Sequence, residues 1–214
     1  MEALQNQINP HFLFNTLNSI SSLVRFDPDR ARDVISKLAT ILRRLLSTGD
    51  SFVPLREEVE FIDNYLDIEV VRFGPEKLRV VKDLDPASLD VMVPSMILQP
   101  LVENSIKHGL ASMVEGGSIH LRSRMADSSL VIEVEDDGVG IEAAQLAKST
   151  RVRGAGIGMS NIYERLEVLY GDAARMTVDS HEGKGTLVRI RLPRLQSTGA
   201  VPEAFYEERS STRR

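Results

Sequence analysis

The sequence predicts an α+β fold, in which an all-helical unit precedes an α/β unit. Apolar residues recur at helical spacing as far as Phe73, and beyond Gly74-Pro75 short alternating runs indicate paired strands. Because those strands mainly form hairpins, we expect a mostly antiparallel mixed sheet with helices on one face. The expected parts are residues 1–75, residues 76–195 and a polar, disordered tail over 196–214.

Composition excludes several classes of protein. The 214 residues, 42% hydrophobic and 27% charged, suit one large or two small globular domains. A net charge of −5 argues against a nucleic-acid partner, and the absence of cysteine excludes disulfides, thiolate zinc sites and cysteine nucleophiles. No apolar run approaches the ~18 residues of a membrane-spanning helix, and no signal peptide is visible. We therefore expect no membrane segment in this chain.

The first two elements are expected to form a helical hairpin, with helices over 2–26 and 29–47 separated by Asp27-Pro28. In the second helix an apolar stripe runs along one side. In the first, a packing seam is predicted at Leu13, Leu17, Ile20 and Val24. Because a lone hairpin buries little surface, a homodimeric four-helix bundle would complete it. The alternative is that the hairpin packs only on the rest of its own chain.

His11 falls on the side of this first helix opposite the seam, with Asn15 and Asn18 beside it. It should face water or a partner, while Phe12 and Phe14 pack sideways. A histidine on a surface helix is usually just a polar residue, so this pattern alone does not assign a function.

The remaining elements follow from apolar periodicity and turn residues. We expect helices over 55–73, 95–109 (capped by Ser95) and 158–170, and strands over 78–81, 118–125, 130–135, 176–180 and 186–192. Residues 85–95 read as a connection and 141–153 as a loop.

Near the end of the apolar helix over 95–109, three polar residues share one helical face. Asn104, Lys107 and His108 stand at positions i, i+3 and i+4 and so aim an amide oxygen, a cation and an imidazole the same way. That set suits a metal–phosphate group. The alternative is a polar last turn, in which Lys and His complement the helix dipole.

Two glycine-containing motifs follow. Asp136, Gly138 and Gly140 come directly after an apolar strand, where a carboxylate can accept a hydrogen bond from an exocyclic amine and glycines let backbone approach a flat ligand. Gly154, Gly156 and Gly158 open a helix, where free N–H groups bind phosphate. Alone, the first could be a plain turn, and the second matches neither the dinucleotide fingerprint nor a Walker A loop.

Together these motifs resemble the ATP-binding domain of the GHKL superfamily, a Bergerat-type α/β sandwich, over about 78–194. The resemblance implies ATP and Mg²⁺ as cofactors, with Asn104 as the metal ligand and Asp136, Gly138 and Gly140 reading adenine. It makes the loop over 141–153 the ATP lid. The other residues assigned to the nucleotide are Lys107, His108, Arg153, Gly154, Gly156, Gly158, Met159, Gly185 and Thr186.

The segment from Gln7 to Asn15 resembles the phosphoacceptor motif of LytS-like sensor histidine kinases, and Gln99 to Asn104 resembles their N box. This implies a cytoplasmic catalytic core, a fragment or partner of a membrane-associated sensor. It would form a homodimer that phosphorylates itself on His11 from ATP and passes the phosphoryl group to an aspartate of a response regulator receiver domain. Asn15 would take part in handling dephosphorylation.

Two residues depart from the wider superfamily. Pro100 stands where an Asn or Glu usually precedes the metal ligand by four residues, which implies poor ATP hydrolysis. Phe12 stands where most histidine kinases have an acid, so the proton-handling partner of His11 is unassigned. The alternative is a catalytically degenerate module that binds ATP and a partner. A GHKL serine kinase of the anti-sigma type fits less well, since that type has no histidine-bearing hairpin.

Overall fold

The computed structural model describes residues 10–46, 51–111, 113–141 and 156–194. Helices α2 (Pro10–Phe26) and α3 (Pro28–Leu46) form the expected hairpin, and Asp27 caps α3 by accepting the N–H of Arg30 at 3.0 Å. Helix α4 (Leu55–Phe73) has the predicted bounds.

A five-stranded sheet forms the other layer. Its order is β2 (Leu78–Leu84), β4 (Gly117–Ala126), β5 (Ser129–Asp136), β7 (Gly185–Pro193) and β6 (Arg175–His181). The pair β2–β4 is parallel and the other three pairs are antiparallel, which confirms the mostly antiparallel mixed sheet. The short strands β1 (Phe52–Pro54) and β3 (Met92–Pro94) pair separately, and single turns η1 (Pro86–Ser88) and η3 (Gly171–Ala173) complete the connections.

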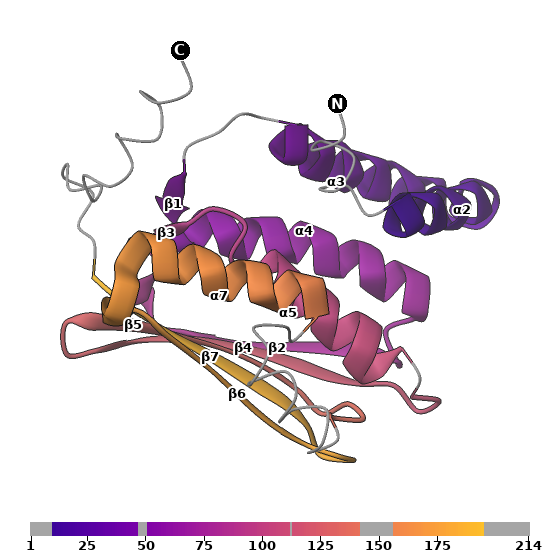
Figure 1. Ribbon diagram of the computed structural model, residues 1–214. Coiled ribbons are helices and arrows are strands. Elements are labelled where there is room, and N and C mark those ends of the chain that lie inside the picture. Colours follow the sequence, from indigo (N-terminus) through magenta and orange to yellow (C-terminus); the bar gives the residue numbers. More distant parts are fainter. Residues whose placement is uncertain (1–9, 47–50, 112, 142–155, 195–214) are drawn as a thin grey trace, which may run out of the picture.

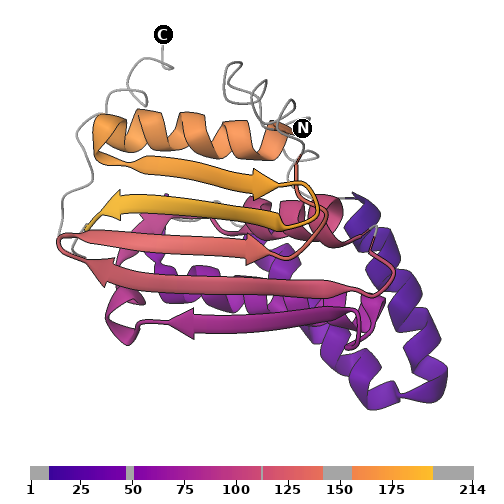
Figure 2. The same ribbon diagram turned by 90° about the horizontal axis from the view of Figure 1, so that it is seen from below.

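Three helical segments cover one face of this sheet: α4, the continuous pair α5 (Gln99–Asn104) and η2 (Ser105–Leu110), and α7 (Gly156–Tyr170) (Figure 1). No described helix covers the other face, as the view from below shows (Figure 2). The core lies between the layers because alternate strand residues point toward the helices. Its fully buried members include Ile62, Leu98, Leu101, Ile119, Leu121, Ile132 and Ile190.

Helix α4 joins the hairpin to the sheet layer. It contacts α3 and α2 on one side and β2 and α5 on the other. At the N-terminal end of α4, the carboxylate of the fully buried Glu58 accepts a hydrogen bond from Arg44 of α3 at 2.9 Å. It also accepts hydrogen bonds from the backbone N–H groups of Met96, Ile97 and Leu98 at 2.9–3.2 Å. The hairpin therefore packs on its own chain through α4.

Within one chain, two of the four residues of the predicted packing seam of α2 are not packed. Leu17 and Val24 are 48% and 54% exposed, whereas Phe12, Thr16 and Ile20 are the buried residues. Phe12, expected at the side, stacks on Tyr65 of α4. The physical reason is that α4 packs against the side of α2 that carries Phe12, a side that a hairpin of α2 and α3 alone would leave exposed.

The predicted helix over 95–109 begins later than expected, at Gln99, and Ser95 does not cap it. Met96 adopts φ +61°, and the loop's amides turn toward Glu58. A buried carboxylate from a distant helix thus takes the place of a local cap. The connection over 85–95 contains η1 and β3, and the strand expected at 78–81 extends to Leu84.

Candidate functional site

The carboxylate of Asp136 ends strand β5 beneath η2 and is 3% exposed. Its Oδ1 accepts the N–H of Gly138 at 3.1 Å, and the side chain of Ser105 and the backbone of Thr186 also hydrogen-bond to it. Burial raises the pKa of Asp136, while these hydrogen bonds oppose the rise. The residue expected to read adenine is thus a desolvated, fixed acceptor.

Glycines surround this carboxylate where no side chain would fit. A Cβ on Gly109 would lie 2.6 Å from Asp136 Oδ1, and one on Gly138 would lie 2.4 Å from the backbone of Gly109. At Gly185, where φ is +86°, a Cβ would lie 1.9 Å from the carbonyl oxygen of Asp136. Gly140, with φ +68°, approaches the carbonyl of His181 in the same way. The structure therefore brings two predicted glycines, Gly138 and Gly185, to the predicted aspartate.

The polar residues of the N-box segment lie along the helix that covers Asp136. Asn104 ends α5 and is half-buried, while Lys107 and His108 are exposed on η2. Residues 105–110 follow π-helical hydrogen bonding, so the α-helical spacing used to place the three on one face does not hold through this turn. Asn104 remains five residues from Gly109, which contacts Asp136.

The third glycine motif is only partly described. Gly156 and Gly158 lie in the first turn of α7, as expected for residues that open a helix, and Met159 is buried. Thr186 pairs with Asp136 across β5 and β7, and its hydroxyl lies 2.8 Å from that of Ser180. The predictions for Arg153, Gly154 and the lid loop from residue 142 fall outside the described residues.

The phosphoacceptor candidate lies on the helical hairpin. His11 is exposed on the first turn of α2, which confirms that it faces away from the packed side. Asn15 Nδ2 lies 3.2 Å from both ring nitrogens of His11. An amide donor at this distance can bond whichever ring nitrogen lacks a proton, so Asn15 can hold the imidazole ring in place.

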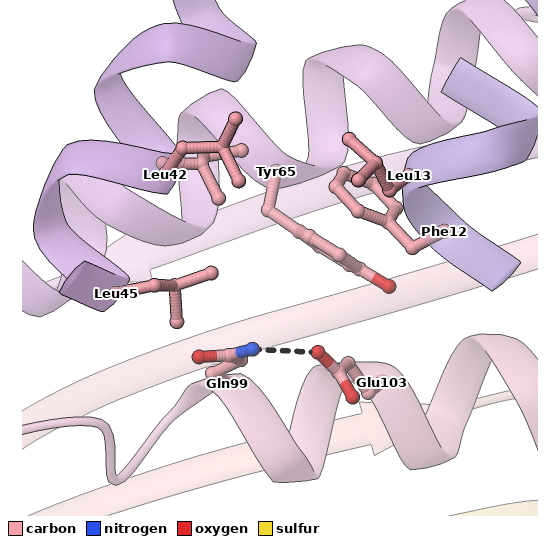
Figure 3. A pocket seen from close by; sticks show the side chains of 8 residues that line it. Phe12, Leu13, Leu42, Leu45, Tyr65, Gln99 and Glu103 are labelled. Carbon is pink, nitrogen blue, oxygen red and sulfur yellow. Dashed lines mark hydrogen bonds between the residues drawn. The ribbon is translucent and has the colours of Figure 1, made fainter. Parts of the chain in front are cut away.

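The residue after His11 faces a small cavity between the hairpin and the N-box helix. The cavity is lined by Phe12, Leu13, Ile41, Leu42, Leu45, Tyr65, Gln99 and Glu103. Figure 3 shows Phe12 against Tyr65, with Gln99 and Glu103 on the helix below; Gln99 donates to Glu103 at 2.7 Å. Burial raises the pKa of Glu103. The hydrogen bond with Gln99 and the positive charge of Lys107 oppose this rise.

Sequence reasoning missed several residues of these sites. The sequence pattern places Gly109 only at the end of the helix over 95–109, although its position five residues after the N-box asparagine could have marked it. Glu58 and Tyr65 belong to a segment that resembles the linking segment of LytS-like kinases, but a single sequence does not show which α4 residues meet α5 and α2.

The family model described as "Histidine kinase-, DNA gyrase B-, and HSP90-like ATPase" matches residues 90–196, and the chain belongs to this family. In particular, residues 1–78 match the model described as "Histidine kinase". Together the two matches confirm the class of protein that the motifs predicted, a GHKL histidine kinase core.

Curated relatives point to the same group. The chain is 36% identical over 201 residues to the sensor protein LytS of Oceanobacillus iheyensis, covering 90% of this chain and 34% of that protein. It is 37% identical over 175 residues to the sensor histidine kinase YpdA of Escherichia coli, covering 80% of this chain and 31% of that protein. The chain thus spans about a third of the length of the curated relatives it matches.

A solved structure agrees on the fold. The histidine kinase domain of the Erythrobacter litoralis blue-light activated histidine kinase aligns with a TM-score of 0.52 at 21% identity, over 90% of each chain. Among the described residues, no helix is both long and apolar enough to cross a membrane.

Proposed function

We propose that this chain is the catalytic core of a two-component sensor histidine kinase. It would phosphorylate itself on His11 from ATP and pass the phosphoryl group to an aspartate of a response regulator receiver domain. The observation that carries the proposal is the combination, in one chain, of an exposed imidazole on a helical hairpin with a buried aspartate enclosed by glycine backbone.

The cradle around Asp136 suits adenine. A buried carboxylate whose own hydrogen bonds are fixed can accept the exocyclic amine, and Gly138 and Gly185 let the chain's own backbone close tightly around that carboxylate. The start of α7 supplies N–H groups for phosphate. We assign Lys107, His108, Met159 and Thr186 to the surroundings of the nucleotide, and Arg153 and Gly154 to its phosphates.

Magnesium fits this donor set when it is held mainly by the nucleotide. Within the described ranges, no three His, Asp or Glu residues are grouped so as to hold a metal on their own. Mg²⁺ commonly keeps its waters and takes one or two protein ligands beside the substrate phosphates, so the half-buried Asn104 would suffice. When bound, the ion would neutralise charge on the phosphates.

The chemistry needs little covalent assistance from the protein. A ring nitrogen of His11 attacks the γ-phosphorus in line; an N–P bond forms as the bond to the bridging oxygen breaks, and ADP leaves. The Asn15 amide lies 3.2 Å from the ring nitrogens of His11 and would hold the ring in place, releasing the attacking nitrogen as its lone pair bonds the phosphorus. We infer the same residue to act in dephosphorylation, when water is the attacking group.

The hairpin retains an apolar face for a second copy of the chain. Phe14, Leu17, Val24 and Ile35 are 48–66% exposed on α2 and α3. A homodimeric four-helix bundle would cover these side chains while leaving the contact with α4 in place.

Labelling with ATP that carries a labelled γ-phosphate tests the proposal. We expect the wild-type chain to acquire acid-labile, base-stable label and His11→Gln to acquire none while binding ATP normally. Persistent label on His11→Gln would remove His11 from this role, and nucleotide binding without any label on the wild type would identify a degenerate binding module instead.

A further inference from the structure

The helix that carries His11 is fixed to α4 of its own chain by the very next residue, Phe12. Phe12 is 7% exposed and stacks on Tyr65 of α4, with ring centroids 4.8 Å apart and an interplanar angle of 28°. Tyr65 is itself only 5% exposed. A stacked, buried aromatic pair of this kind stabilises the contact beyond the area that it buries. Phe12 therefore holds the first turn of α2 in one place.

That place is beside the N-box helix. Phe12 and Leu13 line the same cavity as Gln99 and Glu103 of α5, and Glu103 directly precedes Asn104, the proposed magnesium ligand. In Figure 3 the segment of α2 with Phe12 and Leu13 passes above the helix that carries Gln99 and Glu103. The phosphoacceptor turn and the metal-binding turn of one chain are thus neighbours.

The contact leaves His11 accessible. Neighbouring residues on a helix point about 100° apart, so Phe12 can be buried while His11 remains exposed. Leu17 and Val24, which we assign to a second copy, lie on a further side of α2 and are not needed for this contact. Docking of α2 on its own chain and dimerisation therefore use different sides of the helix and do not compete.

We propose that Phe12 is a positioning residue whose stack on Tyr65 presents His11 to ATP bound by the same chain, so that phosphoryl transfer occurs in cis. The inference rests on the proposed autophosphorylation of His11. Holding both reacting groups on one chain sets their distance and orientation before the reaction, and such orientation lowers the barrier. It also gives a role to an aromatic residue at a position where an acid was expected.

A mixed pair of chains tests the direction of transfer. One chain carries His11→Gln and keeps its nucleotide site; the other carries Asn104→Ala, or in a second pair Asp136→Ala, and keeps His11. The two are co-expressed with tags of different size, purified together and labelled over a wide range of concentrations. We expect neither chain to be labelled. Label on the chain that keeps His11, at any concentration, would overturn transfer in cis.

Wild-type chain labelled in parallel distinguishes a failure of the proposed autophosphorylation from a failure of transfer in cis. If the wild type is not labelled, the proposed function itself fails. If the wild type is labelled and the mixed pair is labelled too, only the inference of cis transfer fails.

Substitution of Phe12 tests the positioning role. Phe12→Ala should lower the labelling rate at saturating ATP about tenfold or more, since misplacement by about 1 Å can cost 100-fold. Its dissociation constant for ATP should be unchanged. Phe12→Tyr, which keeps the ring, should retain most of the rate, and Phe26→Ala removes a ring that is 84% exposed on the same helix and should have no effect. An equal loss of ATP affinity, or a normal rate in Phe12→Ala, would contradict the assignment.

The partner ring supplies an independent check. Tyr65→Leu should slow labelling as Phe12→Ala does, and the double variant should be no slower than either single variant, because both remove one contact. Additive losses in the double variant would show that the two rings act separately and would overturn the proposed stack.

Discussion

The cradle around Asp136 and the attachment of the hairpin are built in different ways. Around Asp136 the chain approaches itself through backbone, and glycines fill positions where any Cβ would meet backbone or carboxylate atoms closer than 3 Å. The hairpin is attached by side chains: Phe12 on Tyr65 and Arg44 on Glu58. Backbone contacts fix one geometry, whereas a few side-chain contacts can be released and remade.

The sharpest way to break the cradle is at Gly185. In Gly185→Ala the new Cβ would lie 1.9 Å from the carbonyl oxygen of Asp136, so the β5–β7 pair must shift. We expect loss of ATP binding and destabilisation above about 4 kcal/mol, as for other substitutions that force backbone apart. Isothermal calorimetry and urea unfolding measure the two effects.

The matched control is Gly183→Ala in the same hairpin. Gly183 has φ +73° but no atom within 4 Å of its would-be Cβ, so only the backbone strain of about 1–2 kcal/mol applies. Normal ATP binding by Gly185→Ala, or equal damage in both variants, would refute the close-approach account.

The attachment of the hairpin depends most on Glu58. Glu58→Ala leaves Arg44 and three backbone N–H groups without their acceptor in a buried place, and we expect a loss of about 3–5 kcal/mol in urea unfolding. Arg44→Ala should cost only about 1 kcal/mol, since Glu58 keeps its backbone donors. Equal destabilisation of the two variants would mean that the three backbone hydrogen bonds to Glu58 contribute nothing to stability.

A third test uses the buried Glu69 beside this attachment. Burial raises its pKa from 4.5 to about 7, although Arg72, with Nη2 2.5 Å from Oε2, opposes the rise. Between these two pH values the folded chain keeps a proton that the unfolded chain has lost. Stability from this group is therefore complete below pH 4.5, falls as the pH rises and levels off above about 7. The total fall is at most about 3 kcal/mol.

Glu69→Gln should flatten this part of the curve of unfolding free energy against pH, with Glu60→Gln on the exposed side of α4 as the control. The same fall in Glu69→Gln as in the wild type would assign the pH dependence to another group.

The smallest effect on stability is expected on the open face of the hairpin. Leu17→Glu places a charge where the side chain is 48% exposed, so the unfolding free energy of one chain should change by less than about 0.5 kcal/mol. Its oligomeric state should nevertheless shift toward monomer in analytical ultracentrifugation. An unchanged dimer would locate the contact between copies elsewhere.

The parts of the fold that follow local patterns were predictable. Helix α4 begins and ends where its apolar spacing, Pro54 and Gly74-Pro75 indicate, and strands β4 and β5 turn at Asp127-Ser128 as expected. For these segments the deciding interactions lie within the segment or in its nearest neighbour, so the sequence carries them.

The errors lie where distant residues decide. The buried side of α2 depends on Tyr65 in α4, and the start of α5 depends on Glu58, which binds the loop ahead of it. For the candidate site, the gathering of Asp136, Gly138 and Gly185 agrees with the motifs, but the contact of Gly109 with Asp136 required the π-helical turn to be seen. Spacing in one sequence does not report such contacts.

The most direct test of the central claim is to locate the phosphoryl group. Wild-type chain incubated with ATP and Mg²⁺ would be digested under alkaline conditions, which preserve phosphohistidine, and sequenced by mass spectrometry. We predict a single phosphorylated position, His11, which is absent when Asp136→Ala is treated alike. A phosphoryl group on His108, His120 or His181, or on a hydroxyl, with His11 unmodified, would contradict the account.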